Sequence, residues 1–388
     1  MTDKTNILFL ATWYPNRANQ SHGIFIHRHA IAISRFARVF VLAVIPEESG
    51  MNKAIEITRG EKDGISNVIV YYRKKNKFFG WLRYIQSLCM GYKAIEKAYG
   101  RPDIVHQHVL TRFGLLALWL KRKYQIPYLV SEHWSRYLDE DTLSNYSKPL
   151  RKWLTRKVVA KASALTSVSD NLAVAMKKKG LQNQYWHLVP NVVNTSLFHL
   201  AKQKKYDRFQ LLHVSNLDDR IKNISGILNA LAILKKTRKD FELIVIGGKP
   251  DQHNYIEQVK RLGLTSIVHL KGFQAPEIVA QSMQNSDLFI LFSHWETQGC
   301  VLLEAMACGC PIIASRVGGI PEIINDANGR VVADNDVEAL ASQIDKMLNN
   351  LDLYNREEIA KNISRNFSME IIGKKFMNIY SDILNRAK

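Results

Sequence analysis

The sequence of 388 residues lacks several features that would place it in common classes of protein. It has no run of 18 or more apolar residues, so we expect no membrane-spanning helix. The first residues, Met-Thr-Asp-Lys-Thr-Asn, lead directly into an apolar strand and do not predict a signal peptide. No G-x-G-x-x-G motif occurs, so the sequence does not indicate a Rossmann dinucleotide fingerprint. It also has no internal repeat and no low-complexity segment.

Cysteine and acidic residues are few. Four cysteines lie at positions 89, 300, 308 and 310 without zinc-site spacing, and we expect the last three to be small core residues in a reducing compartment. The chain has 35 acidic residues against 54 Lys and Arg, a net charge of +19. This excess indicates an anionic partner such as acidic lipid, nucleic acid or a phosphorylated substrate, although a soluble protein from a basic proteome would show the same charge.

Length and patterning together predict the fold class. A chain of 388 residues with 46% hydrophobic residues is too long for one typical core, so two well-filled domains are expected. Strand-like and helix-like segments alternate through both halves, which predicts an α/β protein of two doubly wound domains. Ligands of such domains bind at the carboxyl ends of the strands.

One stretch combines the features of a ligand site. Residues 287–292 form an apolar run of the length of a buried strand, and residues 300–308 are apolar helix formers apart from Glu304. Gly309 suits the left-handed position after a helix, and Pro311 cannot continue that helix and begins the next strand. The pattern predicts strand, loop, helix and strand, with a helix that is apolar on all sides and therefore buried.

The loop and the helix start of this stretch suit a nucleotide. A lone ionised carboxylate in a buried helix is costly unless it meets hydrogen-bond donors, which the two hydroxyls of a ribose would supply to Glu304. The backbone N–H groups of Gly299, Cys300 and Val301 open the helix and favour an anion such as a diphosphate. Glu296 lies just before them, close to whatever the phosphate carries. The alternative is a buried Glu304 paired with Lys or Arg, which produces the same pattern.

The same stretch carries a family resemblance. The spacing Glu-x7-Glu from Glu296 to Glu304 is followed by Glu-Ala-Met-Ala-Cys-Gly-Cys-Pro-Ile-Ile-Ala-Ser and then by Gly-Gly-Ile-Pro-Glu at residues 318–322. In this order the segments resemble the retaining nucleotide-sugar glycosyltransferases of family 4. The resemblance implies the GT-B fold, in which two Rossmann-like domains face each other across a cleft.

The resemblance also implies a division of the chain. Residues 1–190 would form an acceptor-binding domain and residues 191–365 a nucleotide-sugar-binding domain, with residues 366–388 as a helix that crosses back to the first. Pro190-Asn191-Val192-Val193-Asn194 resembles the family's Pro-Asn-Gly-Val-Asp linker and departs from it at Val192 and Asn194.

Further donor-binding residues follow from the resemblance in the second half. Lys222 matches the family's lysine that neutralises the donor diphosphate, and a cation is otherwise not favoured at a helix start. The family's arginine position holds Asn216 here, and Arg220 is the residue that could replace it from the loop. Backbone around Gly272 and Phe273 matches the segment that lines the nucleobase, although Phe273 could instead be ordinary core.

Two strand ends of the first half carry candidate polar residues. Residues 103–108 end in two histidines, of which His108 matches the family's histidine that contacts the donor sugar, with His106 as the alternative. Glu132 and His133 end another strand, and we expect them to face the acceptor. Gly23 opens the first helix, where the family's loop binds acceptor or diphosphate, although a glycine needed only for its turn is the other interpretation.

Cations and large aromatic residues alternate in residues 73–84, which suits an anionic membrane surface. RNA stacking has the same ingredients, and a solvated basic loop is the remaining alternative. Because many members of the resembled family act on lipid-linked acceptors, we favour the membrane and expect no nucleic-acid partner.

Together these features predict a retaining, metal-independent glycosyltransferase with no cofactor. It would move a sugar from a nucleotide-sugar, UDP-linked by family habit, to a hydroxyl of a glycan or lipid-linked acceptor in cell-surface polysaccharide synthesis. The catalytic candidates are His108, Lys222 and Glu296, and Asp218-Asp219 do not form a metal-binding Asp-x-Asp triad. The expected location is the cytoplasm, with peripheral binding to the inner face of the plasma membrane. The alternatives are a binding or scaffold protein impaired by Asn216 and a nucleotide-sugar epimerase of the same fold.

Overall fold

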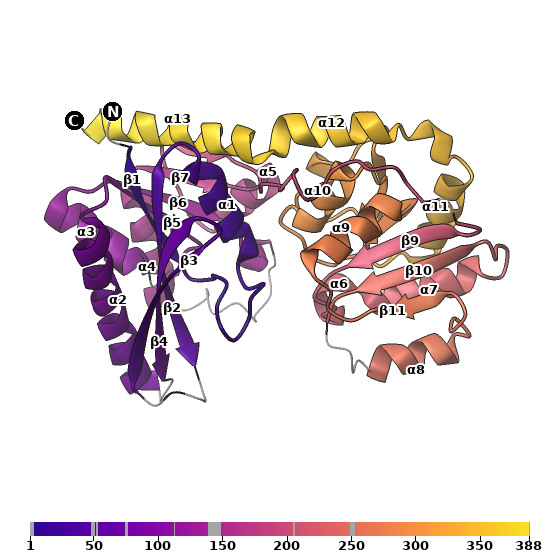
Figure 1. Cartoon of the computed structure of the whole chain (residues 1–388), viewed down its shortest axis with the longest axis horizontal. Coiled ribbons are helices and arrows are strands. Elements are labelled where there is room, and N and C mark those ends of the chain that lie inside the picture. Colours follow the sequence, from indigo (N-terminus) through magenta and orange to yellow (C-terminus); the bar gives the residue numbers. More distant parts are fainter. Residues whose placement is uncertain are drawn as a thin grey trace. The chain divides into compact units, whose positions relative to one another are not determined.

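The computed structural model describes residues 4–47, 51, 53–73, 77–111, 113–138, 149–204, 206–248 and 253–387. The chain divides into two compact units (Figure 1). The first unit comprises Met1–Val192 together with Met369–Lys388, and the second comprises Val193–Ser368. The sequence had placed these boundaries after residues 190 and 365.

The first unit is built on a sheet with the strand order β3-β4-β2-β1-β5-β6-β7-β8. Neighbouring strands are parallel except for the antiparallel pair β3 and β4 at one edge. The strands are β1 (Asn6–Ala11), β2 (Arg38–Glu47), β3 (Ile55–Lys62), β4 (Ile65–Arg73), β5 (Ile104–His108), β6 (Tyr128–Glu132), β7 (Ala164–Ser167) and β8 (Trp186–Leu188). The helices are α1 (Ile24–Ser34), α2 (Lys77–Tyr99), α3 (Gly114–Tyr124), η1 (Ser135–Tyr137), α4 (Pro149–Lys161), α5 (Asp170–Lys178) and α13 (Met369–Ala387).

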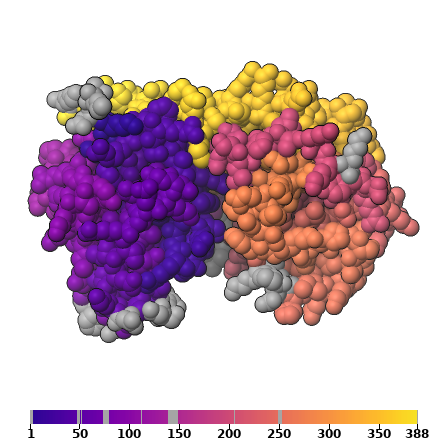
Figure 2. All heavy atoms as spheres, viewed as in Figure 1, coloured from indigo at the N-terminus to yellow at the C-terminus, as the bar shows by residue number. Residues whose placement is uncertain are grey.

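Two hydrophobic cores cover the two faces of this sheet. Successive side chains of a strand point to opposite faces. Leu8 and Leu10 of β1 accordingly pack in one core with residues of α2, α3, α4 and α5, whereas Ile7 and Phe9 pack in the other with residues of α1 and α13. Figure 2 shows the C-terminal segment, in yellow, lying against the indigo N-terminal segment. Helices on both faces confirm a doubly wound α/β unit.

The second unit has an all-parallel sheet with the order β11-β10-β9-β12-β13-β14. The strands are β9 (Phe209–Val214), β10 (Phe241–Ile246), β11 (Val268–Leu270), β12 (Leu288–Leu291), β13 (Ile312–Ser315) and β14 (Gly329–Val332). The helices are α6 (Asp219–Lys222), α7 (Ile224–Leu234), α8 (His253–Arg261), α9 (Pro276–Asn285), α10 (Cys300–Ala307), η3 (Ile320–Glu322), α11 (Val337–Leu348), η4 (Leu351–Leu353) and α12 (Arg356–Phe367).

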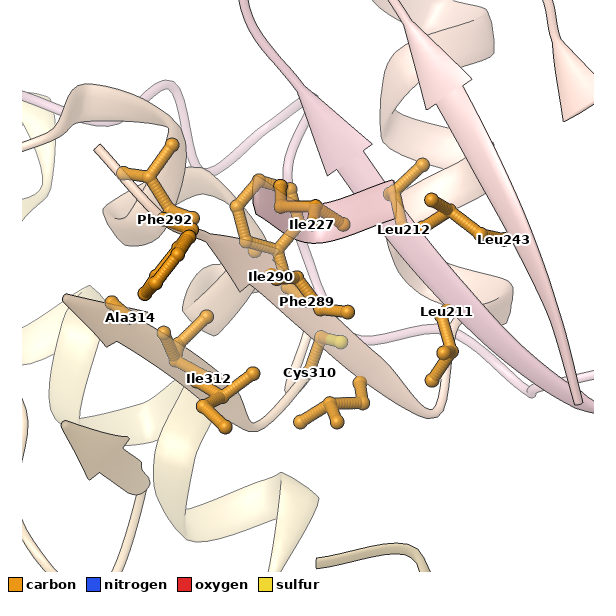
Figure 3. Packing of buried hydrophobic residues seen from close by; sticks show 14 of the residues in the cluster. Leu211, Leu212, Ile227, Leu243, Phe289, Ile290, Phe292, Cys310, Ile312 and Ala314 are labelled. Carbon is orange, nitrogen blue, oxygen red and sulfur yellow. The ribbon is translucent and has the colours of Figure 1, made fainter. Parts of the chain in front are cut away.

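The central strands of the second sheet supply its core. Leu211 and Leu212 of β9, Phe289 and Ile290 of β12 and Ile312 of β13 are all fully buried and lie together in Figure 3. Burying a side chain of this size stabilises the fold by about 1.5–3 kcal/mol. Because parallel strands end at the same edge, this core fixes the loops that follow β9, β12 and β13 beside one another.

The stretch that the sequence singled out folds as strand, loop, helix and strand, as β12, α10 and β13. Gly309 takes the left-handed conformation with φ 77° after α10. A Cβ atom there would lie 2.7 Å from the Arg356 carbonyl oxygen, so glycine is required by both the turn and the close approach. At the start of α5, Ser169 is the residue that caps the helix, accepting from the Leu172 N–H at 3.2 Å.

Candidate active site

The predicted donor residues of the second unit gather where β9 and β12 end. Lys222 lies at the end of α6, in the loop after β9, and Glu296 lies in the loop between β12 and α10. The two loops are joined through the backbone, since the His294 N–H donates to the Ile221 carbonyl at 2.8 Å. The topology therefore brings the two predicted catalytic residues of this unit together.

Lys222 and Glu296 form an ion pair. The Lys222 Nζ lies 2.5 Å from Glu296 Oε2, and the two side chains are 17% and 14% exposed. Both charges are thus partly desolvated but remain within reach of a ligand. The predictions from the sequence assigned these residues separate partners, phosphate for the lysine and sugar for the acid, and missed the ion pair between them.

Helix α10 presents its first turn at the same edge of the sheet. Gly299 is its N-cap residue in the left-handed conformation, with φ 82°, and among the described residues no side chain caps this end. A Cβ atom on Gly299 would lie 3.0 Å from Leu302 and 3.4 Å from Glu296. Cys300, the first helical residue, is half-buried, and Val301 packs at the edge of the core. The start of the helix carries the partial positive charge of the backbone dipoles.

Glu304 is the acid within this helix. It is 5% exposed and is flanked by Leu303 and Ala305, which are fully buried. One turn further on, burial and then the charge of Glu304 raise the pKa of the Cys308 thiol to about 12. Burial also raises the pKa of Cys310 to about 12, so both thiols are protonated core residues at neutral pH, as expected.

Asn216 and Arg220 make contacts within their own loop. The Asn216 side-chain oxygen accepts from the Asp218 N–H at 3.3 Å, while the Arg220 guanidinium lies 2.8 Å from the Asp218 carboxylate. The Arg220 side chain is 85% exposed. The predicted replacement of the family's arginine by Arg220 stays a prediction, because in this arrangement Asp218 compensates its charge.

The predicted nucleobase segment lies at the end of β11. Gly272 has φ 65°, and its carbonyl accepts from the Gly247 N–H at 2.8 Å, which ties the ends of β10 and β11 together. Phe273 is 67% exposed, so it is not the ordinary core residue that the sequence left open as an alternative. A flat aromatic ring at this edge is available for stacking.

Sequence reasoning missed a buried histidine behind Lys222. His213 Nδ1 lies 2.8 Å from the Ile290 carbonyl, and its Nε2 lies 2.8 Å from the Ser215 hydroxyl. Burial, together with a smaller effect of the Lys222 charge, lowers the pKa of His213 to about 4, so the ring is neutral at pH 7. The sequence signal that could have identified it is the position of His213 near the end of the largely apolar run of residues 209–214.

In the first unit, the two predicted histidines of β5 have different surroundings. The His106 ring is held in a buried network, with Nδ1 2.6 Å from the Tyr380 hydroxyl and Nε2 2.6 Å from the Ser131 hydroxyl. His108 Nδ1 lies 3.4 Å from His133 Nε2. Burial lowers the pKa of both His106 and His108 well below the usual value, so both rings are neutral.

Both carboxylate oxygens of Glu132 accept hydrogen bonds from neighbouring backbone N–H groups. Oε2 accepts from the Leu110 N–H at 2.9 Å, and Oε1 accepts from the N–H groups of His133 and Trp134 at 2.9 and 3.0 Å. The residue is fully buried. Its carboxylate thus shapes the turns after β5 and β6, and the acceptor role that the sequence assigned to it remains an untested prediction.

Gly23 is required by its backbone. It has φ 65°, and a Cβ atom on it would lie 2.3 Å from the Trp13 carbonyl oxygen. The turn is sufficient to require glycine here, and the binding role that the family's loop implies for Gly23 stays a prediction.

The first unit also contains a cavity of about 790 Å³. Its walls come from the loop after β1, from the first turns of α2 and α4 and from the turn after β6, and most of the lining side chains are apolar. They include Trp13, Trp81, Tyr84, Trp134, Leu150 and Leu154, together with the cations Arg136 and Arg151. A cavity of this size holds a small molecule or part of a lipid.

The predicted membrane segment is described only in part. Residues 74–76 lie outside the described residues, and so do the side chains of residues 77–79. Trp81 and Leu82 that follow are 45% and 43% exposed. On α4, Leu150 and Trp153 are 76% and 57% exposed on a helix that carries five cations and no acid. Within the described part of the chain, no helix combines the length and hydropathy that crossing a bilayer requires.

Comparison with known proteins identifies this architecture. The solved structure of sucrose-phosphate synthase from Thermosynechococcus elongatus superimposes on 99% of this chain, and over its own full length, with a TM-score of 0.79 at 18% sequence identity. Anabaena HepE, solved in complex with UDP and glucose, superimposes over 97% of the chain and all of its own with a TM-score of 0.73 at 18% identity. The fold is that of the GT-B glycosyltransferases.

Sequence comparison gives the family. The profile described as glycosyl transferases group 1 matches residues 197–366, and that of glycosyltransferase family 4 matches residues 31–197. N-acetyl-alpha-D-glucosaminyl L-malate synthase of Bacillus anthracis is 34% identical over 253 residues, which are 62% of this chain. The match spans 65% of that relative's own length, just under two thirds. The chain belongs to the family 4 glycosyltransferases, as its motifs indicated.

Proposed function

We propose that the protein transfers a sugar, with retention of anomeric configuration, from a UDP-sugar to a hydroxyl group of a lipid-linked glycan acceptor. The choice of UDP is supported by HepE, which was solved with UDP and glucose and with UDP-glucose. Cell-surface polysaccharide synthesis is the process that such an acceptor implies.

The observation that carries the proposal is the Lys222–Glu296 pair beside the first turn of α10. A donor diphosphate that binds at Gly299 would give Lys222 a second anionic partner, and the lysine and the backbone N–H groups would together stabilise the charge that develops on the leaving phosphate. Glu296 would then be released to hold hydroxyl groups of the transferred sugar.

Glu304 completes the donor site in this proposal. Its carboxylate is 5% exposed and would accept hydrogen bonds from both ribose hydroxyls. Hydrogen bonds to a charged acceptor contribute about 1.5–3 kcal/mol each, so two of them would account for roughly a 10²-fold or larger share of donor affinity. The exposed ring of Phe273 would stack on the base.

We further propose that no metal ion bridges the diphosphate. The two adjacent acids of the loop are already engaged, since Asp218 pairs with Arg220 at 2.8 Å and Asp219 Oδ1 accepts from the Ser225 N–H at 2.8 Å. Lys222 and the helix start would supply the positive charge instead. Added Mg²⁺ or Mn²⁺ should leave kcat unchanged, and a strict requirement for either ion in the assay would contradict this mechanism.

The cavity of the first unit supports a lipid-linked acceptor. Its apolar walls suit a lipid chain, and Arg136 and Arg151 suit the phosphate that joins lipid to glycan. Exposed Leu150 and Trp153 among the cations of α4 suit an anionic bilayer, which would place the protein at the inner face of the plasma membrane. Sedimentation with anionic vesicles should be weakened by Trp153→Ser and not by the matched change Trp119→Ser on α3; equal binding of both variants would exclude this surface.

The donor site is tested by binding. A panel of nucleotide-sugars is screened by thermal shift, because a bound donor at about 100 times its Kd adds about 2.7 kcal/mol to the free energy of unfolding. The active UDP-sugar should stabilise the wild type, and Glu304→Gln should weaken its binding by roughly 10²-fold. Glu277→Gln, an exposed acid in the first turn of α9, is the matched control. Unchanged affinity in Glu304→Gln would refute the ribose assignment, and NMR of the product's anomeric centre would test retention.

A further inference from the structure

Three buried imidazoles meet in the first unit. His29 lies on α1, His108 ends β5 and His133 follows the end of β6. His29 and His108 are fully buried and His133 is 8% exposed. One ring nitrogen from each residue lies within 4.8 Å of those of the other two. One helix and two strand ends, far apart in the sequence, thus bring three metal-ligating nitrogens close together.

Hydrogen bonding within the described residues accounts for only part of this arrangement. His29 Nε2 lies 3.4 Å from the Pro190 carbonyl and His133 interacts with the Asn191 side chain, whereas the buried His29 Nδ1 bonds to no described residue. The contact between His108 Nδ1 and His133 Nε2, at 3.4 Å, is long for a hydrogen bond between nitrogens. A buried nitrogen without a partner, such as His29 Nδ1, is uncommon, and a bound ion is one of its ordinary causes.

The spacing fits a tetrahedral metal ion. With Zn–N bonds of about 2.0–2.1 Å, two nitrogen ligands of a tetrahedral zinc lie about 3.4 Å apart. That is the separation of His108 Nδ1 and His133 Nε2. Ring centres of histidines on one tetrahedral zinc are about 5 Å apart by the same geometry. The three pairs here measure 5.9, 5.4 and 5.6 Å, so the rings already form a triangle close to the required size.

We propose that His29, His108 and His133 bind one Zn²⁺ ion through neutral imidazole nitrogens, leaving its fourth position to a small ligand such as water. Imidazole is a preferred zinc ligand, and sites with three histidines are among those that zinc occupies. All three ligands belong to the first unit, whereas the residues proposed to bind the diphosphate belong to the second unit.

The surroundings favour the form of histidine that binds metals. Burial lowers the pKa of His29 to about 4 and holds the pKa of His108 and His133 well below the usual value. The rings of Phe9, Phe25 and Phe376 pack around the three imidazoles, with centres 4.4 Å from His108, 4.7 Å from His133 and 5.2 Å from His29. Binding through Nδ1 of His108 would fix its proton on Nε2 and leave that nitrogen as a donor.

The site ties α1 to the ends of two central strands. Because ligands are assembled only in the folded unit, the free energy of metal binding adds to the free energy of unfolding. Zinc should therefore stabilise the first unit without changing the requirements of the transfer reaction for added Mg²⁺ or Mn²⁺.

The test uses the full chain purified without a histidine tag. Metal content by inductively coupled plasma mass spectrometry should be one zinc per chain. Stripping with a chelator should lower the Tm, and adding Zn²⁺ should restore it. His29→Phe and His133→Phe keep a ring in each place and should reduce zinc affinity by more than about tenfold, whereas His22→Gln, which removes a half-buried histidine outside the cluster, should leave it unchanged.

Cobalt gives an independent measurement on the wild type. Co²⁺ bound by the stripped protein should show the intense visible bands of a tetrahedral ion, whether or not a variant folds. An adventitious ion only, recognised by zinc that neither shifts the Tm nor depends on His29 or His133, would overturn the proposal. Absence of tetrahedral cobalt bands together with no Tm response to Zn²⁺ would overturn it equally, and would leave the three rings as aromatic packing.

Discussion

Replacing Lys222 by glutamine is expected to lower kcat by roughly 10³-fold. The Lys222 side chain is 17% exposed, and charges this close to the protein surface interact with an effective dielectric constant of about 20. A unit charge at about 4 Å from the leaving phosphate then contributes about 4 kcal/mol, and each 1.36 kcal/mol is tenfold in rate. Release of UDP in the presence of acceptor measures the effect. Lys271→Gln, an exposed lysine after β11, is the control.

The ion pair with Glu296 makes the prediction sharper. In the free protein Lys222 is held 2.5 Å from Glu296, so Lys222→Gln leaves an uncompensated acid next to the phosphate site and should weaken UDP binding. Glu296→Gln should instead strengthen UDP binding and lower its Kd by roughly tenfold. The substitution removes a negative charge from the phosphate site and releases Lys222 from its ion pair.

Turnover and binding should therefore separate in the two variants. The kcat should be lower in both variants. Calorimetric titration with UDP should show a higher Kd for Lys222→Gln and a lower Kd for Glu296→Gln. The reasoning is refuted if Lys222→Gln keeps kcat within about threefold of the wild type, or if Glu296→Gln weakens UDP binding as much as Lys222→Gln does.

Three further perturbations test the fold around the site. His213 is unprotonated in the folded chain down to a pKa of about 4, whereas the unfolded chain takes up the proton near its ordinary pKa of about 6.5. The free energy of unfolding should thus fall by about 3 kcal/mol from this residue as pH drops through that window, and His213→Gln should lack this part of the decline in urea titrations. Gly247→Ala would place a Cβ atom 1.7 Å from the Ser215 carbonyl oxygen and should cost more than about 3 kcal/mol; a Tm within about 2 °C of the wild type would contradict the predicted clash. Tyr380→Phe removes the 2.6 Å hydrogen bond to His106 and should cost about 1–2 kcal/mol by denaturant unfolding, with no loss if the hydroxyl is not bonded.

The fold could be predicted from the sequence wherever a segment is buried on both faces. Residues 287–315 contain two apolar strands and an apolar helix with its own stop signal, so local and tertiary preferences agree. Strand β3 was missed for the opposite reason. Its sequence Ile-Glu-Ile-Thr-Arg-Gly-Glu-Lys is half polar, and it pairs only on one side, with β4, at the edge of the sheet.

Individual residues of the candidate site could be predicted from the sequence, but the contacts between them could not. Lys222 and Glu296 were each identified, yet their ion pair joins positions 74 residues apart and depends on how β9 and β12 are neighbours in the sheet. His108 and His133 were likewise singled out separately. His29 was not, because a histidine on a helix carries no local sign that two strand ends will lie beside it.

Helix α13 has a consequence for how the chain is made. Ile372 and Phe376 share a core with Ile7 and Phe9, and a Cβ atom on Gly373 would lie 2.4 Å from the carbonyl oxygen of Ala32. Residues 369–387, which are made after the whole of the second unit, therefore complete the core of the first unit. At synthesis rates of about 5–20 residues per second, the stretch from Val192 to the end of α13 takes on the order of 10–40 s. During that time this apolar face of the nascent first unit is uncovered and accessible to chaperones.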